Sequence, residues 1–438
     1  MRYPLSGDAG PWARYAASAL ALAVSAALPF GQAVAQAVPQ SPVSASSTQL
    51  PLEEALRRAA STDPALAGLE ARGRAGAAAV RQADVRPNPT LGLMVENFPT
   101  LGGDIIDRTE TTLSYEQRLE RGGDRPARVA LARGEAAIVQ AEAAIRGLDR
   151  LEQVQRAWAE ALAAQAELEI ARERLALAER FETEVRRRVD MARDPLFAGA
   201  RAEAALAQAQ IDFDQAEIQA RLARATLGRF WVGASEFSLD PADFEDTSAA
   251  RQVAGGATEI DLAVLAAQRD VATARVRLEQ ARAVPDATVS VGVRHFWDGQ
   301  DLGLVVGGSI PLGRYDRNEG AIERARFEGA AAEADMAALR QEREREIARL
   351  QVLLASQALE ARRIAEEPLP QAERAVVLVR DGFNRGGFTY NDVIAAQTAL
   401  LETRARRVAV LRQFHLDRAR LDRLTGAHAG LLGLETQP

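Results

Sequence analysis

Residues Asp63–Leu93 read DPALAGLEARGRAGAAAVRQADVRPNPTLGL, and residues Asp261–Val291 read DLAVLAAQRDVATARVRLEQARAVPDATVSV. The two stretches align without a gap at a spacing of 198 residues, the separation of Asp63 and Asp261 in the chain, and Pro87 then falls on Pro285. In each, an alanine-rich helical pattern stops at a proline and an alternating apolar and polar pattern follows. A self-match of this kind predicts two similar halves, each built as a helix, a pair of strands and long helices.

The first half, residues 51–231, is expected to begin with a helix that Asp63-Pro64 interrupts, followed by strands at about 90–98 and 111–119. Helical pattern then continues over 126–191 without an internal proline, which corresponds to a helix on the order of 100 Å long. Its apolar residues recur every three or four positions, which predicts a narrow seam of the coiled-coil type. After a reversal at Asp194-Pro195, a second helix is expected over 197–227.

The second half, residues 259–426, repeats this plan after a loop-like linker at 232–258. We expect a helix over 260–283, strands at about 288–297 and 303–310, and a long helix over 319–366 that prolines interrupt before it resumes to residue 383. A reversal precedes the last helix, over 389–424, and residues 427–438 are expected to form a loose tail. The predicted fold class is mainly α with a small β part.

Composition argues against several classes of function. The chain has no cysteine, its formal net charge is −7, and no basic stripe marks it as a nucleic-acid-binding protein. The three histidines, His295, His415 and His428, are not spaced as metal ligands. No nucleophile triad, phosphate loop or carboxylate pair suggests catalysis. We therefore expect no cofactor, no resident metal and no enzymatic activity.

The N-terminus has the pattern of an export signal. Two arginines precede a mostly apolar run over 16–30, and Ala33-Val34-Ala35 is typical of a cleavage site, so residues 1–35 are predicted to be a signal peptide. Residues 36–50 are expected to form a flexible leader without a lipid-anchor cysteine. No later stretch has 18 consecutive apolar residues, so a chain that spans a membrane would have to use its strands.

The strand pairs favour a membrane location over a soluble sheet packed on helices. Strands of this length suit a tilted crossing of a bilayer, with one apolar and one polar face. Four strands cannot close a barrel, and lipid does not tolerate an open sheet edge, so several chains would have to share one barrel. Two chains would give eight strands around a filled interior, whereas three would give twelve strands around a lumen.

The chain resembles the TolC superfamily of outer-membrane efflux proteins and is most similar to its CzcC-like branch, which serves heavy-metal cation pumps. The residues that carry this resemblance are the helix entry Leu50-Pro51-Leu52-Glu53-Glu54-Ala55-Leu56, Asp63-Pro64, Arg86-Pro87-Asn88-Pro89, Gln117-Arg118-Leu119 with Gly122-Gly123, and Ser309-Ile310-Pro311-Leu312. The resemblance covers nearly all of the chain after the signal peptide.

The resemblance implies a homotrimer with a twelve-stranded barrel in the outer membrane of a Gram-negative bacterium and a helical tunnel in the periplasm. It also implies two partners, a periplasmic adaptor and an inner-membrane pump of the RND type. Asp392 falls where some relatives carry a pore-facing aspartate, but Phe388 and Ala395 stand where such relatives have an arginine and a second aspartate. The alternative for Asp392 is a solvated residue in the first turn of a helix.

Charged and glycine residues near the two reversals are further candidates for the tunnel tip and adaptor contact, with solubility as the alternative interpretation. They are Asp190, Arg193, Asp194, Arg380, Asp381, Arg385, Gly386 and Gly387. The leading hypothesis is a passive trimeric conduit that exports heavy-metal cations. The alternatives are the same channel serving drugs or secreted proteins, and a soluble periplasmic coiled-coil adaptor.

Overall fold

A computed structural model describes residues 49–97, 109–231, 237–248, 258–299 and 301–434. The predicted signal peptide at 1–35 and most of the predicted leader at 36–50 lie outside these residues, as do parts of the predicted linker and tail. The described residues all belong to one compact unit, Ser47–Pro438. The described residues are mainly helical and form a single sheet, which confirms the predicted fold class.

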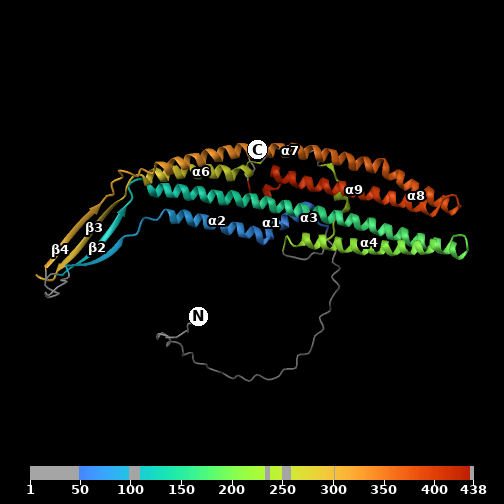
Figure 1. Cartoon of the computed structure of the whole chain (residues 1–438), viewed down its shortest axis with the longest axis horizontal. Helices are drawn as coiled ribbons and strands as arrows, with labels where there is room; N and C mark the ends of the chain where they lie inside the picture. Colours follow the sequence, from blue (N-terminus) through green and yellow to red (C-terminus); the bar gives the residue numbers. More distant parts are fainter. Residues whose placement is uncertain (1–48, 98–108, 232–236, 249–257, 300, 435–438) are drawn as a thin grey trace, which may run out of the picture. The chain divides into compact units, whose positions relative to one another are not determined.

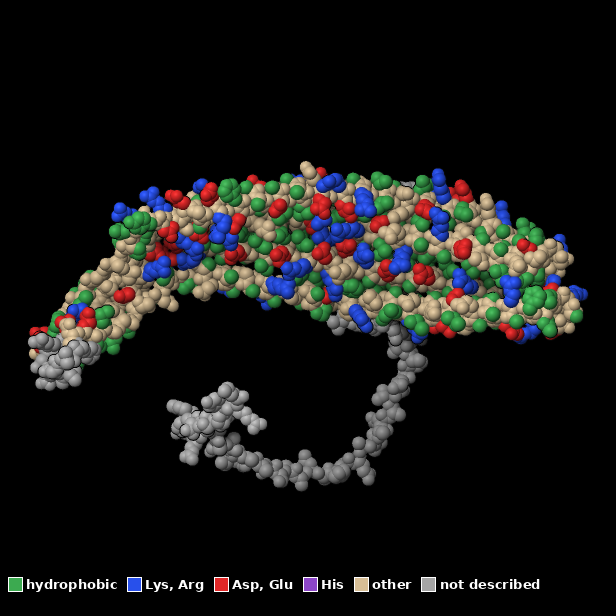
Figure 2. Space-filling model, in the orientation of Figure 1, with side chains coloured by type: hydrophobic (Ala, Val, Ile, Leu, Met, Phe, Trp, Pro, Cys, Tyr) green, Lys and Arg blue, Asp and Glu red, His purple; other side chains and the backbone are tan. Residues whose placement is uncertain are grey.

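The longest element is α3 (Asp124–Asp190), whose 67 residues correspond to about 100 Å. It packs against α1 (Leu52–Thr62), α2 (Pro64–Ala83), α4 (Leu196–Gly228), α6 (Glu259–Arg282) and α9 (Tyr390–Thr425), which lie along it in Figure 1. The helix α7 (Glu319–Glu366) packs on α6 and α9, and α8 (Pro368–Asn384) packs on α9. Acidic and basic side chains are interspersed over the face of these helices in Figure 2.

Four strands form one antiparallel sheet in the order β1 (Thr90–Glu96), β2 (Glu110–Leu119), β3 (Ala287–Phe296) and β4 (Asp301–Ser309). The register aligns apolar side chains into rows across one face; the members of two such rows are Leu91, Tyr115, Val291 and Val306, and Leu93, Leu113, Val293 and Leu304. This apolar face is open, because Leu93 is 70% exposed and Leu304 is 74% exposed. The other face carries glycine, serine, threonine and charged residues, as the alternating sequence pattern predicts.

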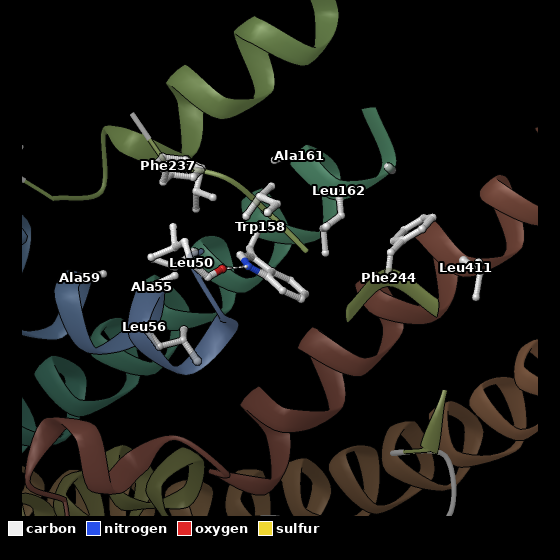
Figure 3. Packing of buried hydrophobic residues seen from close by; sticks show 14 of the residues in the cluster. Leu50, Ala55, Leu56, Ala59, Trp158, Ala161, Leu162, Phe237, Phe244 and Leu411 are labelled. Atoms are coloured by element: carbon white, nitrogen blue, oxygen red, sulfur yellow. Dashed lines mark hydrogen bonds between the residues drawn. The ribbon is translucent and has the colours of Figure 1, made fainter. Parts of the chain in front are cut away.

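The largest apolar core forms where the two halves of the chain meet beside α3 (Figure 3). The indole of Trp158 on α3 donates from Nε1 to the carbonyl oxygen of Leu50 (3.2 Å), which fixes the chain segment that enters α1. Phe237 and Phe244 bring the connection between the halves into the same core. Each of these side chains is at most 5% exposed, so the connection is part of the packed structure.

The described parts of the predicted flexible leader, loop-like linker and loose tail contain regular structure. Gln49, expected in the leader, forms a β-bridge with Ser238. The linker contains the short helix α5 (Pro241–Glu245), whose N-cap Asp240 accepts a hydrogen bond from Ala242 N. The tail contains the 3-10 helix η2 (Ala429–Leu432), which packs near Gly147 of α3.

The repeat seen in the sequence corresponds to a repeated structural role. Asp63 caps α2 and its side chain accepts from Arg150 Nε (2.5 Å), while Asp261 in the first turn of α6 pairs with Arg423 (2.7 Å) and Arg343 (3.1 Å). Both aspartates are almost fully buried, so each depends on its arginine partners. The aligned aspartates thus anchor the start of a helix in each half.

Among the helices of the described residues, none combines the length and the apolar character needed to cross a lipid bilayer.

Candidate functional site

The two helical reversals, from α3 to α4 and from α8 to α9, meet in one apolar cluster that we call the tip cluster. Phe181 of α3 contacts the rings of Phe383 and Tyr390, with ring centroids 5.9 and 4.8 Å apart. The buried members of the tip cluster are Phe181, Val185, Ala198, Ala202, Phe383 and Val393. The structure therefore brings together two hairpins that are about 190 residues apart in the chain.

Both reversals use the same backbone geometry. At the end of α8, Gly386 has φ 80°, its N–H donates to Phe383 O (3.0 Å), and Gly387 N–H donates to Gly382 O (2.8 Å). At the end of α3, Ala192 has φ 54° and the equivalent bonds run from Ala192 to Val189 and from Arg193 to Arg188, both 2.9 Å. This pair of bonds is the Schellman arrangement, which needs a left-handed residue and therefore favours glycine. Ala192 adopts that conformation at a steric cost that Gly386 avoids.

Arg188 links the first reversal to the second. Its Nε and Nη2 atoms donate to the two carboxylate oxygens of Asp194 (2.8 and 3.1 Å), and its Nη1 atom donates to the carbonyl oxygen of Phe383 (3.2 Å). The guanidinium also lies over the Phe383 ring, 4.5 Å from the centroid. The hydrogen bonds to Asp194 raise the pKa of Arg188 further, so the cation persists at any physiological pH.

The second reversal replaces this ion pair with an apolar contact. When the two Schellman turns are superposed in sequence, Arg188 corresponds to Gly382 and Asp194 corresponds to Phe388. A Cβ atom at Gly382 would collide with the Phe388 ring, so the glycine provides the space that the ring uses. The remaining surface of Phe388 is open, because the side chain is 48% exposed.

Asp392 forms a capping box at the start of α9. Its Oδ2 atom accepts from Thr389 N (2.8 Å) and from Thr389 Oγ1 (2.7 Å), and its own N–H donates to Thr389 Oγ1 (3.4 Å). These hydrogen bonds to Thr389 lower the pKa of Asp392. The residue is exposed, so one carboxylate has both a helix-capping role and access to solvent.

The other predicted tip residues divide into two groups. Asp194, Arg385 and Asp381 form ion pairs within their own hairpins, the last two with each other, and Gly386 and Gly387 form the second turn. By contrast, Asp190, Arg193 and Arg380 are exposed side chains at the two reversals. Sequence reasoning missed Arg188 and the aromatic residues Phe181, Phe383 and Tyr390 as the connection between the hairpins.

The aromatic part of the tip cluster has a charged rim. Arg201 of α4 lies over the Tyr390 ring, 5.0 Å from its centroid, while burial raises the pKa of the Tyr390 hydroxyl. Tyr390 therefore remains a neutral phenol at physiological pH. Outside this rim, Leu196 and Phe197 are 83% and 64% exposed at the start of α4. The tip thus combines internal contacts between the two hairpins with an apolar surface that no described residue covers.

The described residues offer no resident metal site, because no group of three or more His, Asp or Glu side chains among them could hold an ion. The tip has hydrogen-bonding, ionic and apolar contacts. Its arrangement can hold two hairpins together, present a surface to another protein, or place a carboxylate beside a passage.

The sequence profile described as "Outer membrane efflux protein" matches residues 55–231 and 257–427. The two matched segments coincide with the two halves of the repeat. The chain is also similar to proteins of metal resistance. It is 28% identical over 420 residues to the cobalt-zinc-cadmium resistance protein CzcC of Cupriavidus metallidurans, covering 91% of this chain and 99% of the relative. It is 30% identical over 284 residues to the nickel-cobalt-cadmium resistance protein NccC of Alcaligenes xylosoxydans, covering 61% and 62%.

Solved structures share the fold at low sequence identity. The outer membrane protein VceC of Vibrio cholerae gives a TM-score of 0.66 at 19% identity, covering 86% of this chain and 96% of that chain. CusC gives 0.69 at 14% identity with 88% and 92% covered, and the MtrE outer membrane channel of Neisseria gonorrhoeae gives 0.68 at 14% identity with 88% and 91% covered.

Proposed function

The chain belongs to the outer membrane efflux protein family, and we propose that it is the outer-membrane conduit of a tripartite system that exports heavy-metal cations. The family is one of channel and transport components rather than enzymes. The observation that carries the metal proposal is the similarity to a cobalt-zinc-cadmium resistance protein over 99% of that protein's length.

Passage across the membrane would use a barrel shared by three copies. The open apolar face of the sheet supports this proposal, because side chains such as Leu93 and Leu304 would be stabilised by contact with lipid. The outer strands β1 and β4 each have one hydrogen-bonded neighbour in the four-stranded sheet, and a neighbouring copy would supply the other. Three copies would give twelve strands with the polar face lining the lumen.

The tip cluster would form the periplasmic entrance. Beside it, the exposed apolar side chains Leu196 and Phe197 and the charged residues Asp190 and Arg380 support contact with a periplasmic adaptor, which would connect the conduit to an inner-membrane pump of the RND type. Three copies of Asp392 would make a carboxylate ring at the passage. The capping box does not conflict with this role, because the side chain is exposed while it caps α9.

The cellular function is tested by deleting the gene and measuring metal content and survival with cobalt, zinc, cadmium and nickel, beside a panel of antibiotics. Metal accumulation that the intact gene reverses is the expected result. Normal metal content with drug sensitivity would instead assign the channel to drug export. Fractionation provides the second test, since a chain recovered in the periplasm without detergent would be a soluble adaptor and not a conduit.

The role of Asp392 needs a variant that keeps the cap. Asp392→Asn leaves an oxygen that can accept from Thr389 N but removes the negative charge. We expect the purified Asp392→Asn channel to lose cation preference in planar bilayers, measured as the reversal potential in a salt gradient. Asp381→Asn, at the same reversal and outside the capping box, is the matched control. Equal reversal potentials for wild type and Asp392→Asn would remove the ring from the mechanism.

A further inference from the structure

The polar face of the sheet carries a three-strand ion-pair cluster that we call the mouth cluster. Glu96 on β1 and Glu110 on β2 are direct partners in the antiparallel register. Two like charges at such positions destabilise a strand pair. Arg294 on β3 removes this conflict: Nη1 donates to Glu110 Oε2 (2.7 Å), Nη2 donates to Glu96 Oε2 (3.0 Å), and Nε donates to Thr112 Oγ1 (2.9 Å).

The mouth cluster lies at the end of the sheet farthest from the helices. The strand β1 runs away from α2 and ends at Glu96, and β2 begins at Glu110 on its way back to α3. The other carboxylate oxygen of Glu110 accepts from the Asn97 side chain (3.0 Å). The step from here to the channel rests on the proposed function: if the apolar face meets lipid, the mouth cluster faces the lumen near the outer opening.

Ions in a lumen could reach these side chains. The Arg294, Glu96 and Glu110 side chains are 29%, 40% and 22% exposed, so the cluster is partly solvated. Carboxylate oxygens are good ligands for divalent cations, and a pair of unpartnered carboxylates in each of three copies would hold them. A conduit works only if ions leave each site readily. With Arg294 present, both carboxylates already have a cationic partner.

We propose that Arg294 is a specificity-determining residue of the exit, which occupies Glu96 and Glu110 so that the conduit does not retain the divalent cations that it passes. Replacing Arg294 with a neutral residue changes the formal charge of these three side chains from −1 to −2 in each copy. The change exposes a carboxylate pair that the strand register holds together. Removal of one positive charge therefore creates a binding site for divalent cations in a channel that otherwise conducts them.

The test compares Cd²⁺ block of single-channel conductance in planar bilayers for the wild type, Arg294→Met and Arg294→Lys. We expect the half-blocking Cd²⁺ concentration to fall roughly tenfold or more in Arg294→Met, because the bare carboxylate pair holds the ion, and to stay near wild type in Arg294→Lys, which keeps the charge. Arg118→Met is the matched control, since Arg118 pairs with one carboxylate, Asp286, at the helix end of the sheet.

A triple variant, Glu96→Gln/Glu110→Gln/Arg294→Met, identifies the atoms that bind. It should return the half-blocking concentration to the wild-type value, and an unchanged Cd²⁺ sensitivity in Arg294→Met would overturn the proposal. If the wild type does not conduct, the proposed function fails first. Calorimetric Cd²⁺ titration of the purified proteins then decides the inference separately: Arg294→Met must bind Cd²⁺ that the triple variant does not, and equal binding would refute it.

Discussion

Replacing Arg188 with alanine should release the two hairpins of the tip from each other. Arg188 makes two hydrogen bonds to Asp194, one to the Phe383 carbonyl and a cation–π contact with the Phe383 ring. The side chains of Arg188 and Asp194 are 21% and 18% exposed, so solvent screens the ion pair only in part. Reduced for that exposure, the contacts together contribute about 2–3 kcal/mol to the local structure.

Amide hydrogen exchange of the purified protein, read by mass spectrometry, measures this local stability. A loss of 2–3 kcal/mol increases the population of the locally open state roughly 30- to 150-fold. We expect faster exchange in Arg188→Ala in peptides that cover residues 381–393 as well as 186–198, because Arg188 reaches across to the second hairpin. Arg188→Lys keeps the charge without the planar fork, so it should show a smaller increase.

Arg187→Ala is the matched control, because Arg187 is the exposed neighbour of Arg188 on the same helix. It should leave exchange at both reversals close to wild type. The reasoning is refuted if Arg188→Ala accelerates exchange only over 186–198. In that case the side chain would stabilise its own turn and not the contact between hairpins.

Two further predictions concern backbone geometry and pH. Both Ala192 and Gly386 have a left-handed backbone, which glycine adopts without steric cost. Ala192→Gly should therefore raise the thermal unfolding midpoint and Gly386→Ala should lower it, each by a shift that corresponds to about 1 kcal/mol. Shifts of the same sign in the two variants would contradict this. Burial lowers the pKa of His415, whose Nε2 atom contacts Phe244 O (2.9 Å), so the folded state keeps the ring neutral while the unfolded chain takes up a proton. Stability should therefore fall as the pH drops below about 6.5, and His415→Gln should reduce the difference in unfolding midpoint between pH 7.5 and 5.5.

The repeat and the order of elements could be predicted because their signals are local. Proline after a helical run, alternation in the strands and glycine at helix ends each act over a few residues. The glycine at the end of the last helix, Gly426, has φ 69° as such a cap requires. Two local signals were present but unused: Asp240-Pro241 is typical of a helix start and marks α5, and Thr389 with Asp392 three residues later is the pattern of a capping box.

The contacts that join the hairpins could not be predicted from the sequence. Arg186, Arg187 and Arg188 are consecutive, and helical periodicity alone does not say which of them faces a hairpin almost 200 residues away. The partner of Arg188 on that hairpin is a backbone carbonyl. Every residue has such a group, so the residue type does not reveal the contact. The left-handed backbone of Ala192 could not be predicted either, because alanine rarely adopts this conformation. The mouth cluster depends in the same way on the register between β2 and β3, which lie far apart in the chain.

The outer strands of the sheet also affect how mutations would be inherited. Because β1 and β4 have one neighbour each within the chain, the proposed trimer would complete every sheet edge with a strand from another copy. A chain with a damaged edge strand would still assemble with intact copies, and the mixed trimer would lose its function. In a cell carrying both alleles, such a mutation would be dominant, whereas a mutation that prevents the chain from folding would be recessive.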